Sequence, residues 1–319
     1  AGKWNLFVEG LPSPNLTTAT TTNLTGVITG NGSVLASKTN PSGAIVGTTD
    51  TQTLTNKTLT NPKLNEDVAV TIKASELNGM LSGWIPAGET WTYASADDPT
   101  YTFTVAADVT TKYSAGMKIK LTQGTVKYFI ITAISDFTGG KTTITVYGGT
   151  DYDLADSAIS ANAYSMMRTP VGFPMSPVKW SVITTDTSAR QQNNPTQNAW
   201  YNLGSVSISV PIGVWYLGYS VNVQFYKEGT TDLEGEVTLS TANNSESDAG
   251  YTSVLSYYHG TSSNKFFTTG FSREKIVEKA TKGSHYLNTK WNLTSGAGTN
   301  IYNRGDLATT TLRATCAYL

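Results

Sequence analysis

Apolar and polar residues alternate along much of this chain with a period of two, the spacing of a half-buried β-strand. The pattern is clearest at 101–105, 117–121, 143–147, 206–210, 214–225, 236–240, 285–291 and 310–319. Segment 126–132 is apolar almost throughout, as expected of a central strand. Glycines and prolines separate these runs where turns are needed. The sequence therefore predicts an all-β protein.

One stretch departs from the strand pattern. Residues 154–164 read Leu-Ala-Asp-Ser-Ala-Ile-Ser-Ala-Asn-Ala-Tyr. Alanine is the best helix former among the natural residues. We therefore expect one short helix here, in a chain that otherwise consists of strands and turns.

Composition divides the chain into three regions. Residues 1–82 are rich in Thr, Gly, Ser and Pro and poor in large apolar residues, which predicts a fibrous shaft and not a globular domain. Residues 83–170 hold about five or six strand patterns, typical of a small antiparallel β-barrel or sandwich. Three prolines within eight residues, beginning at Pro170, indicate a stiff boundary. Residues 171–319 hold about eight strand patterns, typical of a jelly-roll-like β-sandwich.

The segment 46–62 is exceptionally rich in threonine, and Leu54 and Leu59 are its only long apolar side chains. β-Branching favours extended backbone, but two leucines cannot offset the entropy lost on ordering the segment alone. Either the segment is disordered, or identical copies wrap around a shared axis and bury their leucines together. The second interpretation places these residues on the axis: Leu54, Leu59, Leu64, Val68, Val70 and Ile72.

Charge and cysteine content exclude several classes of protein. A formal net charge of −1 with 14% charged residues gives no electrostatic reason to expect a nucleic acid partner. No apolar run reaches the roughly 18 residues that a membrane-spanning helix needs. Residues 1–7 lack the layout of a signal peptide and an initiator Met, so we expect a processed, trimmed or renumbered N-terminus. The single cysteine, Cys316, is predicted to be a small buried residue of the last strand.

The residues that enzymes and metal sites require are scarce. His259 and His285 are the only histidines, and neither has the spacing of a metal motif. No nucleophile elbow or phosphate-binding loop occurs. The acidic pairs Asp97–Asp98 and Glu234–Glu236 could act as glycosidase carboxylates, but solvated turns and strand edges are the favoured interpretation. We therefore expect no catalytic residues, no metal site and no cofactor.

The C-terminal region carries a candidate carbohydrate site. Sugars stack their C–H faces on aromatic rings, and Asn, Asp, Glu and Arg satisfy their hydroxyls. Loops that combine aromatic residues with asparagine supply the candidates: Trp200, Tyr201, Asn243, Asn244, Tyr251, Tyr257, Tyr258 and His259. Each aromatic residue has an alternative role in the core or at a subunit interface.

Several segments resemble bacteriophage tail proteins. Residues 50–62, Asp-Thr-Gln-Thr-Leu-Thr-Asn-Lys-Thr-Leu-Thr-Asn-Pro, are similar to a motif that recurs in tail-fibre and receptor-binding proteins. Residues 83–93, Gly-Trp-Ile-Pro-Ala-Gly-Glu-Thr-Trp-Thr-Tyr, together with 116–123 and 169–174, are similar to a module of phage structural proteins. The ending 312–319 resembles the last strand of their C-terminal heads, whereas 180–310 carries no such resemblance.

This resemblance implies an elongated homotrimer with a fibrous β shaft, a small β-barrel shoulder and a jelly-roll-like β-sandwich head. The N-terminal region would bind other tail or baseplate proteins at the periphery of the virion, and the head would bind host cell-surface polysaccharide. It implies no catalytic residues, no nucleic acid and no membrane insertion. Two alternatives stay open: a structural virion component, such as a capsid fibre or baseplate spacer, and a polysaccharide-degrading spike.

Overall fold

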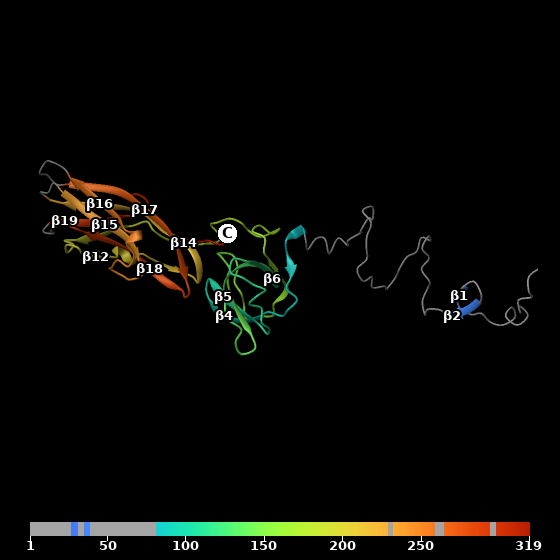
Figure 1. Ribbon diagram of the computed structural model, residues 1–319. Coiled ribbons are helices and arrows are strands. Elements are labelled where there is room, and N and C mark those ends of the chain that lie inside the picture. The colour runs from blue at the N-terminus through green and yellow to red at the C-terminus, as the bar shows by residue number, and fades with distance from the viewer. Residues whose placement is uncertain (1–26, 31–34, 39–80, 229–231, 259–264, 294–297) are drawn as a thin grey trace, which may run out of the picture. The chain divides into compact units, whose positions relative to one another are not determined.

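A computed structural model describes six segments of the 319-residue chain (Figure 1). They are 27–30, 35–38, 81–228, 232–258, 265–293 and 298–319. The chain divides into two compact units, Ala1–Val70 and Thr71–Leu319. In the first, β1 (Val27–Gly30) and β2 (Leu35–Lys38) form an antiparallel pair. The six residues predicted to lie on a shared axis, Leu54, Leu59, Leu64, Val68, Val70 and Ile72, are outside the described residues.

A seven-stranded antiparallel sheet occupies the first part of the second unit. Its strands are β3 (Ile85–Pro86), β4 (Thr92–Asp97), β5 (Thr100–Val105), β6 (Lys118–Gln123), β7 (Thr125–Ile134), β8 (Thr142–Tyr147) and β9 (Ser160–Ser165). Their order is β3-β9-β6-β7-β8-β5-β4. Alternate residues face the core, where the Trp91 ring stacks on Phe103 with centroids 4.5 Å apart. β3 and β4 do not pair with each other among the described strands, so closure into a barrel stays a prediction.

The prediction of a helix over 154–164 is wrong. Residues 160–165 form β9, which pairs with β6, and the residues before it form an irregular loop. The Gln123 side-chain amide donates to the carbonyls of Ala155 and Ser157 at 2.9 and 3.0 Å. Backbone groups that a helix would pair internally are thus bound by the neighbouring strand. Pairing with the sheet therefore overrides the helix propensity of alanine.

Two further antiparallel sheets form a β-sandwich in the rest of the chain. The six-stranded sheet contains β10 (Ser181–Asp186), β20 (Thr310–Cys316), β14 (Gly213–Lys227), β19 (Thr299–Arg304) and β11 (Ala189–Asn193) in that order, with β17 (Lys265–Lys279) also on β14. The five-stranded sheet contains β12 (Trp200–Tyr201), β18 (Gly283–Trp291), β15 (Asp232–Ser240) and β16 (Ser253–Tyr258), with β13 (Ser207–Val210) also on β18. The prediction of an all-β, sandwich-like chain is confirmed at this level.

The helical structure in the described residues is short. Leu81 and Ser82 are helical, and 3-10 turns span Leu203–Ser205 and Ala249–Tyr251. No helix in this part of the chain is both long and apolar enough to cross a membrane.

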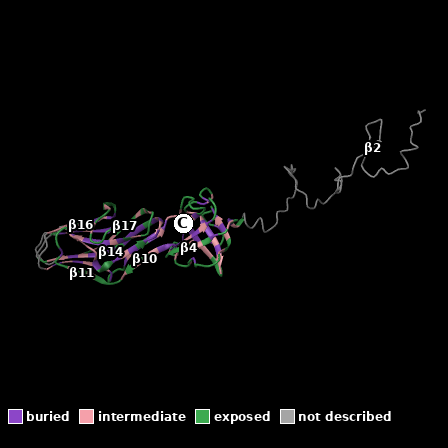
Figure 2. Ribbon diagram, turned by 90° about the horizontal axis from the view of Figure 1, so that it is seen from below, coloured by how far each residue is buried: buried purple, intermediate pink, exposed green. Residues whose placement is uncertain are grey.

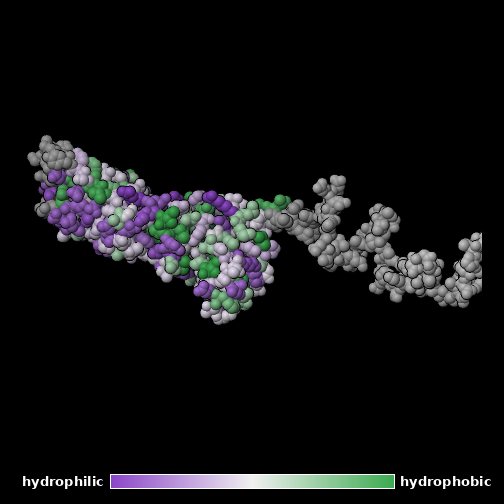
Figure 3. All heavy atoms as spheres, viewed as in Figure 1, coloured by the Kyte–Doolittle hydropathy of each residue, from purple (hydrophilic) through white to green (hydrophobic). Residues whose placement is uncertain are grey.

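The core of the sandwich lies between its two sheets. Buried residues, purple in Figure 2, alternate with more exposed ones along its strands. β14 turns a row of apolar side chains inward: Trp215, Leu217, Val221, Val223 and Phe225. A polar link crosses this core at Tyr219, whose hydroxyl lies 2.9 Å from the Tyr251 carbonyl and 3.0 Å from Ser253 Oγ. The outer surface is mostly hydrophilic in the view of Figure 3. The strand period therefore assigns apolar side chains to the interior and polar ones to the surface.

Cys316 is buried in β20, as the sequence predicts. Burial raises the pKa of its thiol to about 11. The thiol is therefore protonated at neutral pH and chemically inert.

The seven-stranded sheet and the sandwich pack against each other. Phe173 stacks on Trp180 with ring centroids 4.9 Å apart and planes 6° apart. Tyr147 of β8 meets Trp215 of β14 edge to face at 4.9 Å. Lys118 of β6 donates to the Tyr318 carbonyl at 2.7 Å. One apolar cluster thus continues from the seven-stranded sheet into the sandwich.

His285 couples the stability of the sandwich to pH. It is buried near the start of β18, and its Nδ1 has no hydrogen-bond partner among the residues that the structure describes. Burial lowers the pKa of the imidazole to about 4, and repulsion from Lys279 contributes. In the unfolded chain the pKa of histidine is close to 6.5. Between these values the unfolded state binds more protons, so stability falls as the pH decreases.

We predict that lowering the pH from 7 to 5 destabilises the wild-type sandwich by about 2 kcal/mol through His285. His285→Gln carries no titrating ring and should lose correspondingly less over the same range. Urea unfolding followed by tryptophan fluorescence measures both proteins at both pH values. Equal losses in the two proteins would contradict this role of His285.

Candidate functional site

The outer surface of the five-stranded sheet carries an aromatic ring beside a half-buried ion pair. Trp200 of β12 lies opposite Lys290 of β18, and Lys290 lies opposite Glu236 of β15. The Lys290 ammonium is 4.7 Å from the centroid of the Trp200 ring and 2.9 Å from Glu236 Oε2. These side chains form one row across three strands, with the cation between ring and carboxylate.

Asn292 extends this row to a second carboxylate. Its side-chain amide donates to Glu236 Oε1 at 2.8 Å and to Glu234 Oε1 at 3.1 Å. The Gln197 side chain donates to the Asn292 carbonyl at 3.0 Å. Both oxygens of Glu236 are thereby engaged. We call the surface formed by Trp200, Glu234, Glu236, Lys290 and Asn292 the Trp200 face.

The strand period explains why these polar side chains point outward. In β15, Leu233, Val237 and Leu239 are buried, so Glu234 and Glu236 must face the other side. Between the two glutamates, a Cβ at position 235 would come within 2.1 Å of the Phe225 ring. Glycine at this position therefore lets the core pack directly beneath the Trp200 face.

The loop 241–248 is fixed beside the Trp200 face by Asn288. This buried side chain donates to the carbonyls of Ala242 and Ser245 at 3.1 and 2.7 Å and accepts from the amide of Asn244 at 3.2 Å. The Asn244 side chain in turn accepts from the amide of Asn202, two residues after Trp200, at 2.7 Å. Asn244 has a φ of 54°, which asparagine tolerates better than most residues.

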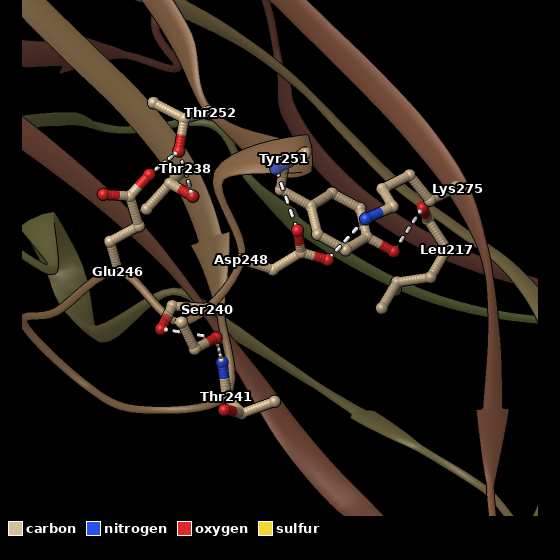
Figure 4. A network of polar contacts seen from close by, with 11 residues as sticks. Leu217, Thr238, Ser240, Thr241, Glu246, Asp248, Tyr251, Thr252 and Lys275 are labelled. Carbon is tan, nitrogen blue, oxygen red and sulfur yellow. Dashed lines mark hydrogen bonds and ion pairs between the residues drawn. The ribbon is translucent and has the colours of Figure 1, made fainter.

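A second set of contacts holds the end of the same loop (Figure 4). The Thr252 hydroxyl donates to Glu246 and is hydrogen-bonded to Thr238 at 3.0 Å. Asp248 pairs with Lys275 of the other sheet. The hydrogen bond from Lys275, together with one from a backbone amide, lowers the pKa of the Asp248 carboxyl. The loop is thus anchored to both sheets.

The structure brings together only part of the predicted carbohydrate site. Trp200 is half-buried and lies next to the loop that carries Asn243 and Asn244, both of which are exposed. Tyr201 is half-buried, and its hydroxyl accepts from the Thr196 amide at 2.8 Å, which is a structural contact.

Tyr251 was a wrong candidate. Its side chain is 2% exposed, and its hydroxyl donates to the Leu217 carbonyl at 3.2 Å. A ring inside the sandwich core offers no face to a sugar. The 3-10 turn Ala249–Tyr251 directs this tyrosine inward, a local geometry that the sequence pattern does not reveal.

Two of the remaining candidates, Tyr257 and Tyr258, belong to β16, which lies apart from Trp200. Tyr257 is half-buried on β16 and stacks on Phe267, with centroids 4.5 Å apart. Tyr258 is the last residue of β16, and its side chain is not described; His259 lies outside the described residues. β16 and β12 are at opposite edges of the sheet, separated by two strands, or about 14 Å.

Sequence reasoning missed Lys290 and Asn292 as members of this surface. It had singled out Glu234 and Glu236 only as glycosidase carboxylates. The alternation within 285–291 places Lys290 outside the core, but its partner on β12 follows only from the strand register.

The Trp200 face and its adjoining loop carry a net negative charge. Lys290 is the single cation among them, against the carboxylates of Glu234, Glu236, Glu246 and Asp248, of which Asp248 is paired with Lys275 of the other sheet. The described residues contain no group of three or more side chains suited to a metal ion. The arrangement therefore favours neutral or cationic ligands over anionic ones.

Comparisons with known proteins give no family. No family model and no curated protein matches the chain. Solved structures with local likeness include infectious bursal disease virus, Gx strain (12% identity, TM-score 0.23, 72% of this chain and 62% of that one). Another is the T13 particle of that virus, with 13% identity and a TM-score of 0.25 over 71% of this chain and 60% of that one. A third is latent PorU of Porphyromonas gingivalis, with 10% identity and a TM-score of 0.24 over 74% of this chain and 25% of that one. The chain thus spans less than two thirds of each, and TM-scores this low carry no functional argument.

We predict that Asn288→Ala releases the loop beside the Trp200 face. Three hydrogen bonds to loop backbone would be lost, at a cost of about 1–3 kcal/mol for buried groups left unpaired. Hydrogen exchange of the Asn244 amide should accelerate markedly. Ser256→Ala, at an exposed position of the same sheet, is the matched control. Unchanged exchange in the Asn288 variant would show that the loop is held by other contacts.

Proposed function

We propose that this chain is a virion protein of the phage tail-fibre type that attaches the particle to host cell-surface glycan through its C-terminal sandwich. The proposal rests on the sequence resemblance to tail proteins and on one structural observation, the Trp200 face. There a half-exposed indole lies in a row with an ammonium, two carboxylates and an amide. Carbohydrate sites need this combination of aromatic surface and convergent polar groups.

The Trp200 face can bind a sugar with little reorganisation. The ring would stack against sugar C–H groups, while Glu234 and the exposed Asn243 would bind hydroxyls. Lys290, Glu236 and Asn292 hold one another by hydrogen bonds and an ion pair. A site fixed in this way loses little conformational entropy on binding.

Each single site is expected to be weak, and avidity would supply the strength. A homotrimer would hold three copies of the Trp200 face on one body, and many trimers on a virion would raise the effective concentration further. The N-terminal region would join the protein to other tail or baseplate proteins. Host polysaccharide suits this mechanism because it presents the same sugar many times.

We propose a binding role without catalysis. Glu236 accepts a hydrogen bond from Asn292 on Oε1 and pairs with Lys290 through Oε2, so both of its oxygens are already bound to protein groups. Asn292 also binds Glu234. The two carboxylates are thus held by protein groups and act as acceptors.

We predict that Trp200→Ala weakens binding of the purified protein to host cells or isolated cell-wall glycan by about tenfold or more per site, the effect expected of a central tryptophan. Tyr216→Ala is the matched control, since Tyr216 is 40% exposed on the other sheet. Its binding should equal that of the wild type. Solid-phase binding with purified glycan measures all three proteins.

Other outcomes of this experiment would replace the proposal. Absence of binding by the wild type, with no block of infection, would favour a structural virion component. Release of reducing ends from the glycan, abolished in Glu234→Gln, would establish a polysaccharide-degrading enzyme. Equal binding by the wild type and Trp200→Ala would move the site elsewhere.

The charge of the Trp200 face predicts selectivity among sugars. A neutral oligosaccharide should compete for binding at least about tenfold better than an acidic one of equal length at low salt. Added salt should reduce the difference in competition between the neutral and the acidic oligosaccharide, because salt screens exposed charges. Glu234→Gln should also narrow it, while Asp136→Asn, at an exposed position of the seven-stranded sheet region, should not. Equal competition by both sugars would contradict this assignment.

A further inference from the structure

An apolar groove lies on the seven-stranded sheet, where the described part of the second unit begins. It has a volume of about 590 Å³. Its walls include Trp84, Pro86, Ala163 and Val171, with Lys120 at its side. It is far from the Trp200 face in the sequence and shares no residue with it. The proposed glycan site therefore leaves this groove without a role.

Large exposed hydrophobic side chains gather around the groove. Five of the fourteen in the described residues fall within two short segments: Leu81 (68% exposed), Ile85 (38%), Met166 (70%), Met167 (50%) and Val171 (66%). The segments lie side by side, since the Val171 amide donates to the Ser82 carbonyl at 2.9 Å. Soluble monomers rarely expose so concentrated an apolar surface.

The floor of the groove is held in place by specific contacts. The indole N–H of Trp84 donates to the Val171 carbonyl at 2.8 Å, and the Lys120 ammonium lies 4.9 Å from the indole centroid. At the edge of the groove, Ala161 has a φ of 50°. This left-handed conformation is energetically unfavourable for any residue that has a side chain. A bulge between β6 and β9 adjoins this position. The groove is therefore preformed.

We infer that this groove and its apolar rim are the contact between copies of this chain. The eighty residues before Leu81 include the threonine-rich segment proposed to associate around a shared axis, and Leu81, the first described residue after that segment, lines the groove. Copies that associate through that segment would carry their grooves close to the same axis. Rotational symmetry then brings the same residues of each copy together around the axis. The inference thus rests on the proposed self-association and assigns its continuation to named residues.

Two matched valine variants test this interface. Val171→Asp places one carboxylate per copy near the axis, whereas Val254→Asp alters a valine that is 61% exposed on the sandwich. Multi-angle light scattering of the full chain should give three times 34.1 kDa for the wild type and Val254→Asp. Val171→Asp should dissociate at a concentration at least tenfold higher than the wild type does. Circular dichroism should show the same strand content in all three.

A cysteine variant gives an independent measurement that does not depend on weakening the fold. Cys316 is buried, so a cysteine introduced as Val171→Cys would be the one accessible thiol among the described residues. Mild oxidation should link copies through position 171. Val254→Cys should stay unlinked at the same protein concentration.

Three results would overturn the inference. They are a monomeric wild type at micromolar concentration, equal masses for the two aspartate variants, and no preferential linking through position 171. A lower melting temperature of Val171→Asp without a change in mass would mean that the chain covers its own groove. Failure of the glycan proposal can be distinguished from failure of this inference. The Trp200→Ala experiment measures glycan binding, and its substitution lies outside the groove, so it leaves the oligomeric state unchanged.

Discussion

The inward row of β14 is the constraint on which the rest of the sandwich depends. Trp215, Leu217, Val221, Val223 and Phe225 are buried between the sheets, and Trp215 also contacts Tyr147 of the seven-stranded sheet. These side chains pack against the apolar residues of the facing sheet. Because side chains alternate along a strand, the residues between those apolar positions must point outward. Glycine at position 235 lets Phe225 pack against the facing sheet directly beneath Glu234 and Glu236. The surface chemistry is thus a consequence of core packing.

A surface built in this way is rigid, which suits recognition of a repetitive ligand. The Trp200 ring is set by pairing with β18, and the neighbouring carboxylates are set by Lys290 and Asn292. The adjoining loop is anchored through Asn288 and through the Asp248–Lys275 pair. Weak sites of fixed geometry gain most from multiple copies, because little entropy is lost when the second and third sites engage. The proposed contact at Val171 would place those copies on a common axis.

Much of the fold could be predicted from periodicity, because a strand that buries alternate side chains has apolar residues at every second position of its sequence. The strands around Phe103, Ile144 and Leu217 lie where alternation placed them, and Cys316 is buried in the last strand. The helix expected near Ala155 failed because contacts with Gln123 and pairing with β6 outweigh local propensity. The site was only partly predictable. The Asn244 side chain binds the amide of Asn202, two residues after Trp200. Lys290, however, joins Trp200 through a strand register that no local pattern encodes, and a single 3-10 turn buries Tyr251.

The central claim is that sugar binds on the outer surface of the five-stranded sheet. A crystal structure of the protein with an oligosaccharide that blocks adsorption tests it most directly. The account predicts a sugar ring stacked on the indole of Trp200 at about 4 Å, the distance of van der Waals contact, with a hydroxyl bound by Glu234. An ordered oligosaccharide bound elsewhere, with the Trp200 ring uncovered, would contradict it.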